Sequence, residues 1–331
     1  MKLLVFEYIT GGGMTTTPNV SLVREGDKML FALLKDLTEI PSLSLMALRD
    51  SRLAFSTNAA AAVDWITVEP HDEIMSSLGC AIDQVDAVWP IAPETGRVLE
   101  SVCALVRRRG KILLNSTAEG VRLAASKFLT ATRLGDKGIP VVPTERWQRS
   151  MTHPPLPFPL VIKTDDGVGC EDTRIIMDTL DWNEHGGPDR PGDWVAQPFM
   201  DGESLSLCGL FAQGKAILLS VNRQHIHQQD NTFMLKGCTV NTIADENGIF
   251  SGLIQQIAAA IPELWGYAGV DLIRNKGGLH VLEINPRLTS SYAGLRAALG
   301  LNPAQLVIDL LDSGHLPQLA ERPPQPVEVT W

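Results

Sequence analysis

Residues 269–292 read GVDLIRNKGGLHVLEINPRLTSSY, and this stretch has the pattern of a β-hairpin. Two apolar runs, 268–274 and 279–284, flank the segment NKGG, which has the residues that a tight turn requires. A turn of about two to four residues pairs Asp271 with Glu283, to within one position. The sequence therefore predicts two carboxylates side by side on neighbouring strands.

Asp271, Glu283 and Asn285 offer only oxygen ligands to a cation, and Glu283 and Asn285 share a face because strand side chains alternate. Two carboxylates about 4 Å apart repel by roughly 4 kcal/mol at an effective dielectric of about 20, so this arrangement needs a cation. Hard oxygens favour Mg²⁺, or Mn²⁺ in its place, with other coordination positions left to water and substrate phosphates. The alternative is a hairpin whose acidic residues face water. Arg287, which follows directly, favours the metal site.

The composition describes a soluble globular chain of two or three domains. Of the 331 residues 44% are hydrophobic and 20% charged, and the mean hydropathy is +0.05. No apolar run approaches the ~18 residues of a membrane span, and the opening MKLLVFEY is expected to be a buried first strand rather than a signal peptide. The net charge of -10 and the pI of about 5.2 argue against a nucleic acid or an anionic membrane as the main partner.

Five cysteines are scattered without a C-x-x-C pair, which indicates neither a zinc knuckle nor a disulfide framework. We therefore expect a cytoplasmic protein. The sequence is compatible with a homodimer. His225 and His227 share a strand face, and a transition-metal site there is an alternative to a plain exposed strand.

The first 115 residues alternate between strands and helices. Strands are expected at 3–6, 43–48, 65–68, 86–91 and 111–114, and helices at 17–37, 71–82 and 94–109. This order predicts a parallel sheet with helices on both faces, and ligands of such sheets bind beyond the carboxyl ends of the strands. Glu7, Tyr8 and Glu94 fall at those ends, as does the glycine loop 11–13, which either contacts substrate or is an ordinary flexible loop.

The pattern changes after Ser116. A helix is expected at 126–134, and two strands at 160–163 and 173–177 flank the segment DDGVGC. The backbone N–H groups of such a hairpin can fold over phosphates, and Lys163, just before the loop, can contact a phosphate oxygen as a point charge. The alternative is an ordinary glycine turn that joins two strands and binds no ligand.

Strands at 194–199, 204–211 and 215–226 follow, with helices at 247–260 and 303–312 and an extended tail. The connection at Phe199 to Glu203 could clasp a flat base, with backbone groups at its edge and Glu203 accepting from ribose hydroxyls. A plain strand crossing is the alternative.

The chain resembles the ATP-grasp superfamily over nearly its whole length. The resemblance rests on Lys127, Lys163, the glycine-containing loop DDGVGC at 165–170, the connection at Phe199 to Glu203 and the hairpin residues Asp271, Glu283, Asn285 and Arg287. The resemblance implies an α/β pre-ATP-grasp domain at 1–115 and two α+β subdomains, 116–195 and 196–331, that hold ATP between them. It implies two Mg²⁺ ions on Asp271, Glu283 and Asn285, with Arg287 and Lys163 as catalytic residues. It implies ATP contacts from Lys127, Lys163, Gly167, Gly169, Gln197, Phe199, Met200 and Glu203.

Within the superfamily, FEYITGGG at 6–13, NRQ at 222–224 and EINPRLTSSYAGL at 283–295 resemble the tyramine–glutamate ligases of methanofuran biosynthesis and their bacterial relatives. The resemblance implies an ATP-dependent ligase that joins a small carboxylate to an amine. Gln197 and Pro198 depart from the acidic residue that many members have at the clasp.

The residues also suggest where two small-molecule substrates bind. Arg287, Ser290 and Ser291 offer a polar pocket for a carboxylate such as glutamate, and Arg223 could bind a second carboxylate. An amine approaching from the N-terminal domain would meet Glu7 and Glu94, for which loop packing is the alternative role. Two rival functions remain, an ATP-grasp phosphotransferase and a non-catalytic nucleotide-binding module. A dehydrogenase is disfavoured because no G-x-G-x-x-G fingerprint occurs.

Overall fold

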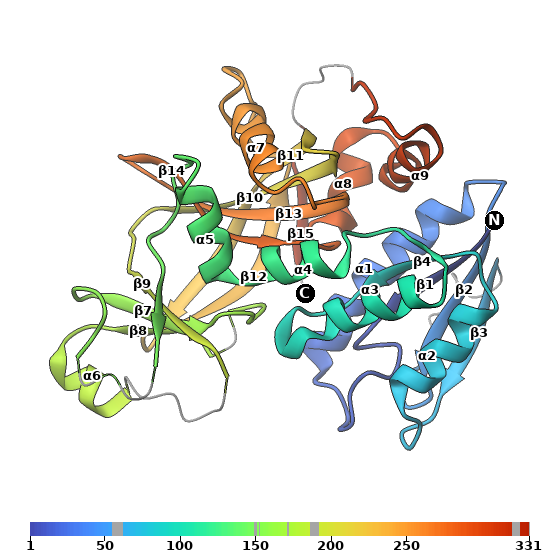
Figure 1. Cartoon of the computed structure of the whole chain (residues 1–331), viewed down its shortest axis with the longest axis horizontal. Helices are drawn as coiled ribbons and strands as arrows, with labels where there is room; N and C mark the ends of the chain where they lie inside the picture. The colour runs from blue at the N-terminus through green and yellow to red at the C-terminus, as the bar shows by residue number, and fades with distance from the viewer. Residues whose placement is uncertain are drawn as a thin grey trace.

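The computed structural model describes residues 1–54, 62–148, 151, 153–170, 172–185, 192–319 and 325–330. These residues build two sheets, a parallel one near the N-terminus and a larger antiparallel one that follows it (Figure 1). Within this described part, no helix combines the length and apolarity that crossing a membrane requires.

The N-terminal sheet has five parallel strands in the order β3-β2-β1-β4-β5. Its elements are β1 (Lys2–Glu7), α1 (Val20–Thr38), β2 (Ser44–Asp50), β3 (Val63–Val68), α2 (Ile74–Asp83), β4 (Ala87–Ile91), α3 (Val98–Arg108) and β5 (Ile112–Leu113). Alternate side chains of β1 enter different cores, since Leu3 and Val5 pack with α1 whereas Leu4 and Phe6 pack with α2 and α3. The predicted parallel sheet with helices on both faces is confirmed.

Two helix boundaries differ from the sequence-based expectation. Helix α1 begins after Asn19, three residues later than expected, because the Asn19 side chain accepts a hydrogen bond from the Ser21 N–H and caps the helix there. The helix expected at 94–109 is broken, because a short 3₁₀ helix (Thr95–Arg97) ends in left-handed backbone, with φ of 59° at Arg97, before α3 begins.

The second sheet has ten strands in the order β14-β13-β10-β11-β12-β8-β7-β9-β6, with β15 beside β12. Its strands are β6 (Glu145–Trp147), β7 (Leu160–Thr164), β8 (Arg174–Ile176), β9 (Trp194–Pro198), β10 (Glu203–Ala212), β11 (Lys215–Gln229), β12 (Thr232–Val240), β13 (Gly266–Asn275), β14 (Gly278–Asn285) and β15 (Val327–Thr330). The helices of this part are α4 (Ala118–Ala125), α5 (Lys127–Gly135), α6 (Thr179–His185), α7 (Ile249–Ala260), α8 (Tyr292–Leu299) and α9 (Pro303–Ser313). The predicted fold class is observed, with an α/β part that contains the parallel sheet and an α+β part that contains the second sheet.

Strand β12 and helix α4 were not predicted. β12 follows β11 through Asp230 and Asn231, which have φ of 47° and 62° and form the kind of two-residue turn that favours Asp and Asn. The expected extended tail is confirmed at β15, while residues 321–324 and 331 of that tail lie outside the described residues.

The hairpin of β13 and β14 has the expected register. Asp271 lies opposite Glu283, and a bulge follows between Asp271 and Leu272. Val270 and Leu272 are buried in the core that covers the other face of the sheet, and burying one such side chain contributes about 1.5–3 kcal/mol. The carboxylates are thereby directed away from that core.

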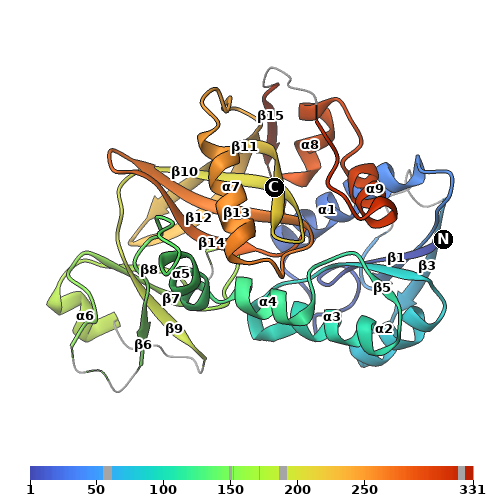
Figure 2. The ribbon, with the colours of Figure 1, turned by 45° about the horizontal axis from the view of Figure 1, so that its top comes forward.

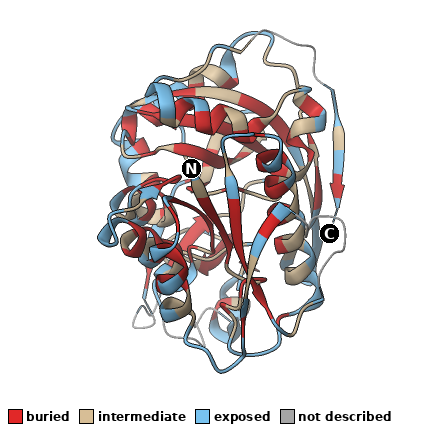
Figure 3. Cartoon of the chain, turned by 90° about the vertical axis from the view of Figure 1, so that its right-hand side faces the viewer, coloured by how far each residue is buried: buried red, intermediate tan, exposed pale blue. Residues whose placement is uncertain are grey.

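Helix α1 joins the two parts of the molecule by packing against α8 and α9 (Figure 2). Asp36 of α1 accepts hydrogen bonds from the Tyr292 hydroxyl at 2.8 Å and from Arg296 Nη1 at 3.0 Å. Buried residues follow the strands and the inward sides of the helices, so that one continuous core runs through this junction (Figure 3). The N-terminal domain is therefore placed firmly enough to contribute to a site on the second sheet.

Candidate functional site

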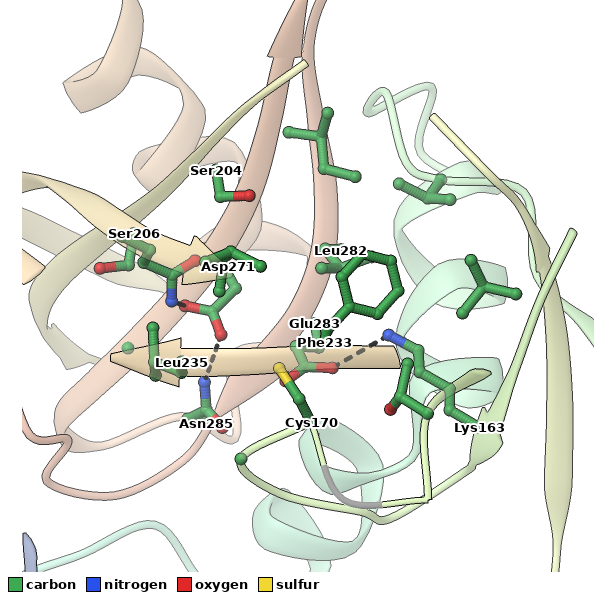
Figure 4. Close-up of a pocket in the computed structure, with 18 of the residues that line it drawn as sticks. Lys163, Cys170, Ser204, Ser206, Phe233, Leu235, Asp271, Leu282, Glu283 and Asn285 are labelled. Atoms are coloured by element: carbon green, nitrogen blue, oxygen red, sulfur yellow. Dashed lines mark hydrogen bonds and ion pairs between the residues drawn. The ribbon is translucent and has the colours of Figure 1, made fainter. Parts of the chain in front are cut away.

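A cavity of about 490 Å³ is lined by two groups of strands of the second sheet, β7 and β9 on the one hand and β10 to β14 on the other. Its apolar end is lined by Val161, Phe199, Met200, Phe233, Leu235, Ile273 and Leu282. Its polar end is lined by Glu25, Arg287, Thr289, Ser290 and Ser291. Between the two ends, side chains of Asp271, Glu283 and Lys163 converge (Figure 4).

Asp271 occupies the middle of the cavity wall. Its carboxylate accepts hydrogen bonds from Gln224 Nε2 at 3.1 Å and from Asn285 Nδ2 at 3.2 Å. Burial raises the pKa of Asp271, and the nearby charge of Glu283 raises it further. The surroundings of Asp271 therefore favour the neutral form of its carboxyl group unless a cation binds beside it.

Glu283 is held by two lysines. Its Oε2 lies 3.4 Å from Lys127 Nζ and 3.3 Å from Lys163 Nζ. Burial acts to raise the pKa of Glu283, but the two ammonium groups outweigh burial and the pKa is lowered overall. Burial lowers the pKa of Lys163, although the charge of Glu283 opposes this effect. The predicted pair of phosphate-binding lysines therefore meets the predicted metal ligand in one cluster.

The oxygen ligands predicted for a metal are compatible with a hard cation. Asp271 and Glu283 are cross-strand neighbours, and Asn285 adds an amide oxygen to the same wall. No group of three or more His, Cys, Asp or Glu side chains suited to a metal occurs in the described ranges, so the set is complete only with Asn285 and non-protein ligands. Mg²⁺ commonly binds in this way, through few carboxylates together with water and phosphate oxygens.

The glycine loop, residues 165–170, closes one side of the cavity through Gly167 and Gly169. Lys127 Nζ donates to the carbonyl oxygen of Gly167 at 2.7 Å, which ties this loop to helix α5. Asp165 accepts from the Phe128 N–H at 2.8 Å and Asp166 from the Gly96 N–H at 2.9 Å. The two aspartates of this loop therefore have structural partners.

The apolar end brings together the residues predicted for a base. The rings of Phe199 and Phe233 stack with centroids 6.4 Å apart, and Phe233 comes from the unpredicted strand β12. The Phe199 N–H donates to the Pro159 carbonyl at 3.0 Å, so this N–H already has a partner and the ring is the part available to a ligand. Gln197 lines the cavity and donates through Nε2 to the Thr144 hydroxyl at 2.9 Å.

Glu203 and Arg223 both line the cavity but contact each other. Arg223 Nε donates to Glu203 Oε1 at 2.6 Å, and Arg274 Nε donates to Glu203 Oε2 at 2.9 Å. Burial acts to raise the pKa of Glu203, and the hydrogen bonds from the two guanidinium groups outweigh it and lower the pKa. A ribose bound by Glu203, or a carboxylate bound by Arg223, would therefore have to approach a residue that is already paired with the other.

Arg287 is fixed from the N-terminal domain. Its Nε donates to Glu94 Oε2 at 2.9 Å, and its Nη1 donates to the Leu288 carbonyl at 3.2 Å. The Ser290 hydroxyl donates to Glu25 on α1. Sequence reasoning missed Glu25, whose only signal was its place on a helix that follows the glycine loop of the first domain.

Comparison with known proteins identifies the family. A model described as a pre ATP-grasp 3 domain matches residues 43–121, and one described as an ATP-grasp domain matches residues 124–291. The chain belongs to the ATP-grasp family. Tyramine--L-glutamate ligase from Methanocaldococcus jannaschii is 27% identical over 299 residues, which cover 89% of this chain and 84% of that protein.

Solved structures share the ATP-grasp fold. An ATP-grasp superfamily protein from Archaeoglobus fulgidus superposes with a TM-score of 0.71 at 20% identity, covering 100% of this chain and 99% of that chain. L-amino acid ligase from Bacillus licheniformis has a TM-score of 0.69 at 16% identity and covers 93% of this chain and 73% of that chain. The predicted ATP-grasp fold is confirmed, and the ATP-grasp domain with its ligase relatives identifies the chain as an ATP-dependent ligase.

Some of the residues predicted for this ATP-grasp site lie elsewhere. Glu7 does not line the cavity, because its carboxylate accepts from the Thr10 N–H at 2.6 Å and from the Ile9 N–H at 3.2 Å. Burial raises its pKa to about 7. The glycine loop 11–13 is packed rather than open, since a Cβ on Gly13 would lie 2.4 Å from the Tyr8 ring.

The histidine pair on β11 is also remote from the site. Gln224 and Ile226 line the cavity, so His225 and His227 alternate to the opposite face of the strand. His225 Nε2 lies 2.9 Å from the Thr239 hydroxyl. The metal-site alternative for this pair has no further ligands in the described residues.

Proposed function

We propose that this ATP-grasp protein is a carboxylate–amine ligase that activates glutamate as an acyl phosphate and joins it to a small amine such as tyramine. The observation that carries the proposal is the convergence of Lys127, Lys163, Glu283, Asp271 and Arg287 on one cavity. The relative from Methanocaldococcus jannaschii, named for this pair of substrates, supports the choice of glutamate and tyramine. The resemblance of the segments 6–13, 222–224 and 283–295 leads us to propose a place in a methanofuran-type pathway.

In the proposed arrangement the apolar end of the cavity takes the adenine and the middle takes the phosphates. The rings of Phe199 and Phe233 offer an apolar surface to the base. Lys127 and Lys163 supply positive charge to phosphate oxygens, and the N–H groups of the glycine loop can close over them. Asp271, Glu283 and Asn285 would hold two Mg²⁺ or Mn²⁺ ions, which when bound would neutralise phosphate charge.

The proposed reaction has two steps. A carboxylate oxygen of glutamate attacks the γ-phosphorus of ATP, and the bond from that phosphorus to the bridging oxygen of ADP breaks. The amine nitrogen then attacks the acyl carbon, phosphate leaves with the carboxylate oxygen, and the nitrogen loses a proton to give the amide. Arg287 and the lysines stabilise charge on the transferring group, and closure of the glycine loop keeps water from the acyl phosphate.

Release of ADP tests this proposal. Purified protein with ATP, Mg²⁺, L-glutamate and tyramine should release ADP and form the amide, and hydroxylamine in place of tyramine should give a hydroxamate. A phosphorylated product without amide or hydroxamate would instead indicate the phosphotransferase. Binding of ATP without any substrate-dependent ADP release would indicate the non-catalytic module.

A further inference from the structure

Helix α1 of the N-terminal domain closes the polar end of the cavity with an acidic side chain. Glu25 lies near the start of α1 and lines the cavity together with Arg287, Ser290 and Ser291. One of its oxygens, Oε1, accepts a hydrogen bond from the Ser290 hydroxyl. In the described part of the chain, the other oxygen has no hydrogen-bond donor and the carboxylate has no ion-pair partner. Glu25 therefore presents to the cavity a carboxylate oxygen without a hydrogen-bond donor, with the guanidinium of Arg287 as a nearby positive charge.

Arg287 shares this end of the cavity but is already engaged by Glu94. Its Nε donates to Glu94 Oε2 at 2.9 Å, and its Nη1 donates to a carbonyl at 3.2 Å. Glu94 is 4% exposed, and its second oxygen is buried without a hydrogen-bond partner among the residues that the structure describes. Two carboxylates thus come from the N-terminal domain to meet one guanidinium, which leaves the local charge negative.

This charge arrangement is complementary to a ligand that carries an ammonium group next to an anionic group. An ammonium has three N–H donors, which suit a carboxylate oxygen and neighbouring hydroxyls. The free oxygen of Glu25 and the neighbouring hydroxyl of Ser290 supply such acceptors at the polar end of the cavity. The remaining N–H groups of Arg287, on Nη1 and Nη2, suit a carboxylate.

We propose that Glu25 binds the ammonium group of a substrate and thereby selects ammonium-bearing substrates over otherwise similar uncharged ones. The assignment rests on the proposed ligase function. The ammonium belongs either to the amino acid that is activated or to the amine that attacks it, and the same carboxylate chemistry serves both. Glu25 is a specificity-determining residue in either case.

A purely structural role for Glu25 would be to hold Ser290 between the two domains. That role predicts a larger consequence for Ser290→Ala than for Glu25→Gln, because glutamine keeps an amide oxygen that can accept the hydrogen bond from Ser290. Direct binding predicts the reverse, because only Glu25→Gln removes the charge. Glu69 provides a matched control, since this exposed glutamate also accepts from a serine hydroxyl, that of Ser51 at 2.8 Å, and does not line the cavity.

The experiment measures dissociation constants of paired ligands, with ATP analogue and Mg²⁺ present, by calorimetry. The pairs are L-glutamate with glutarate, and tyramine with 4-ethylphenol, each pair differing by one ammonium group. Wild-type protein should prefer the ammonium-bearing member of one pair by about 10- to 100-fold, the range expected of one charge-assisted hydrogen bond. Glu25→Gln should abolish that preference, Ser290→Ala should reduce it only in part, and Glu69→Gln should leave it unchanged.

The pair whose preference collapses identifies the source of the ammonium. The inference is overturned if neither preference changes in Glu25→Gln, if Ser290→Ala abolishes the same preference, or if the wild type has no preference in either pair. Failure of the proposed function is recognised separately, by the absence of ADP release from the wild type with L-glutamate and tyramine.

Discussion

Replacing Glu283 by glutamine should destabilise the protein even without ligand. The carboxylate lies 3.4 Å from the Lys127 ammonium and 3.3 Å from the Lys163 ammonium, and these lysine side chains are only 5% and 8% exposed. Removing one partner of a buried ion pair costs about 3–5 kcal/mol, because the remaining charge is left without compensation. We expect a loss of about 3 kcal/mol, since Glu283 is itself 18% exposed and Lys163 can lose its proton.

Thermal unfolding without nucleotide measures this loss. In a chain of this size, about 1 kcal/mol corresponds to a shift of about 2 °C or somewhat more, so the midpoint should fall by roughly 6 °C. Glu100→Gln is the matched control, because Glu100 is also 17% exposed but pairs with Arg97, which is 67% exposed. A surface pair of that kind contributes less than about 1 kcal/mol.

A double variant shows whether the lysines cause the effect. Lys163→Met combined with Glu283→Gln removes a positive and a negative charge together, so it should be clearly more stable than the sum of the two single losses predicts. An unchanged midpoint in Glu283→Gln, or strictly additive losses in the double variant, would refute the view that this carboxylate holds the lysines in place.

Three further outcomes are expected. The pKa of Glu7 is raised from 4.5 to about 7 in the folded state, so the stability that Glu7 contributes is complete below pH ~4.5 and is lost as the pH rises through ~7. Relative to Glu7→Gln, the free energy of unfolding in urea should therefore fall by about 3 kcal/mol between pH ~4.5 and ~8. Parallel pH curves for the two proteins would contradict this. Phe233→Ala should weaken ATP binding about 10-fold in calorimetry and leave binding of L-glutamate unchanged, because the Phe233 ring lies at the apolar end of the cavity. Equal losses of affinity for both ligands would show that adenine does not bind at that end. Gln224→Leu should raise the Mg²⁺ concentration needed for nucleotide binding about 10-fold or more, because Gln224 orients Asp271, and an unchanged Mg²⁺ dependence would show that it does not.

The sequence was sufficient for the centre of the site because that centre is local. Asp271 and Glu283 sit on one hairpin whose turn residues and alternation specify the register, so their pairing could be predicted without knowledge of the rest of the fold. The parallel order of the N-terminal sheet followed in the same way from alternating strand and helix patterns.

The walls of the site depend on long-range packing, and the sequence could not supply them. Glu25 reaches Ser290 across 265 positions, and Glu94 reaches Arg287 across 193, so no local pattern links either pair. Phe233 was missed because β12 was not recognised, although the Asp-Asn turn before it was a usable hairpin signal. Glu7 was expected in the site because it ends a strand, but its own turn supplies the N–H donors that satisfy it.

Transfer of an oxygen atom tests the ligase mechanism most directly. L-glutamate labelled with ¹⁸O in its carboxylates is supplied with ATP, Mg²⁺ and tyramine, and the inorganic phosphate is analysed by mass spectrometry. An acyl phosphate passes one substrate oxygen to the phosphate, so each phosphate released with amide should contain one ¹⁸O atom. Amide formed together with unlabelled phosphate would contradict activation of the carboxylate in this cavity.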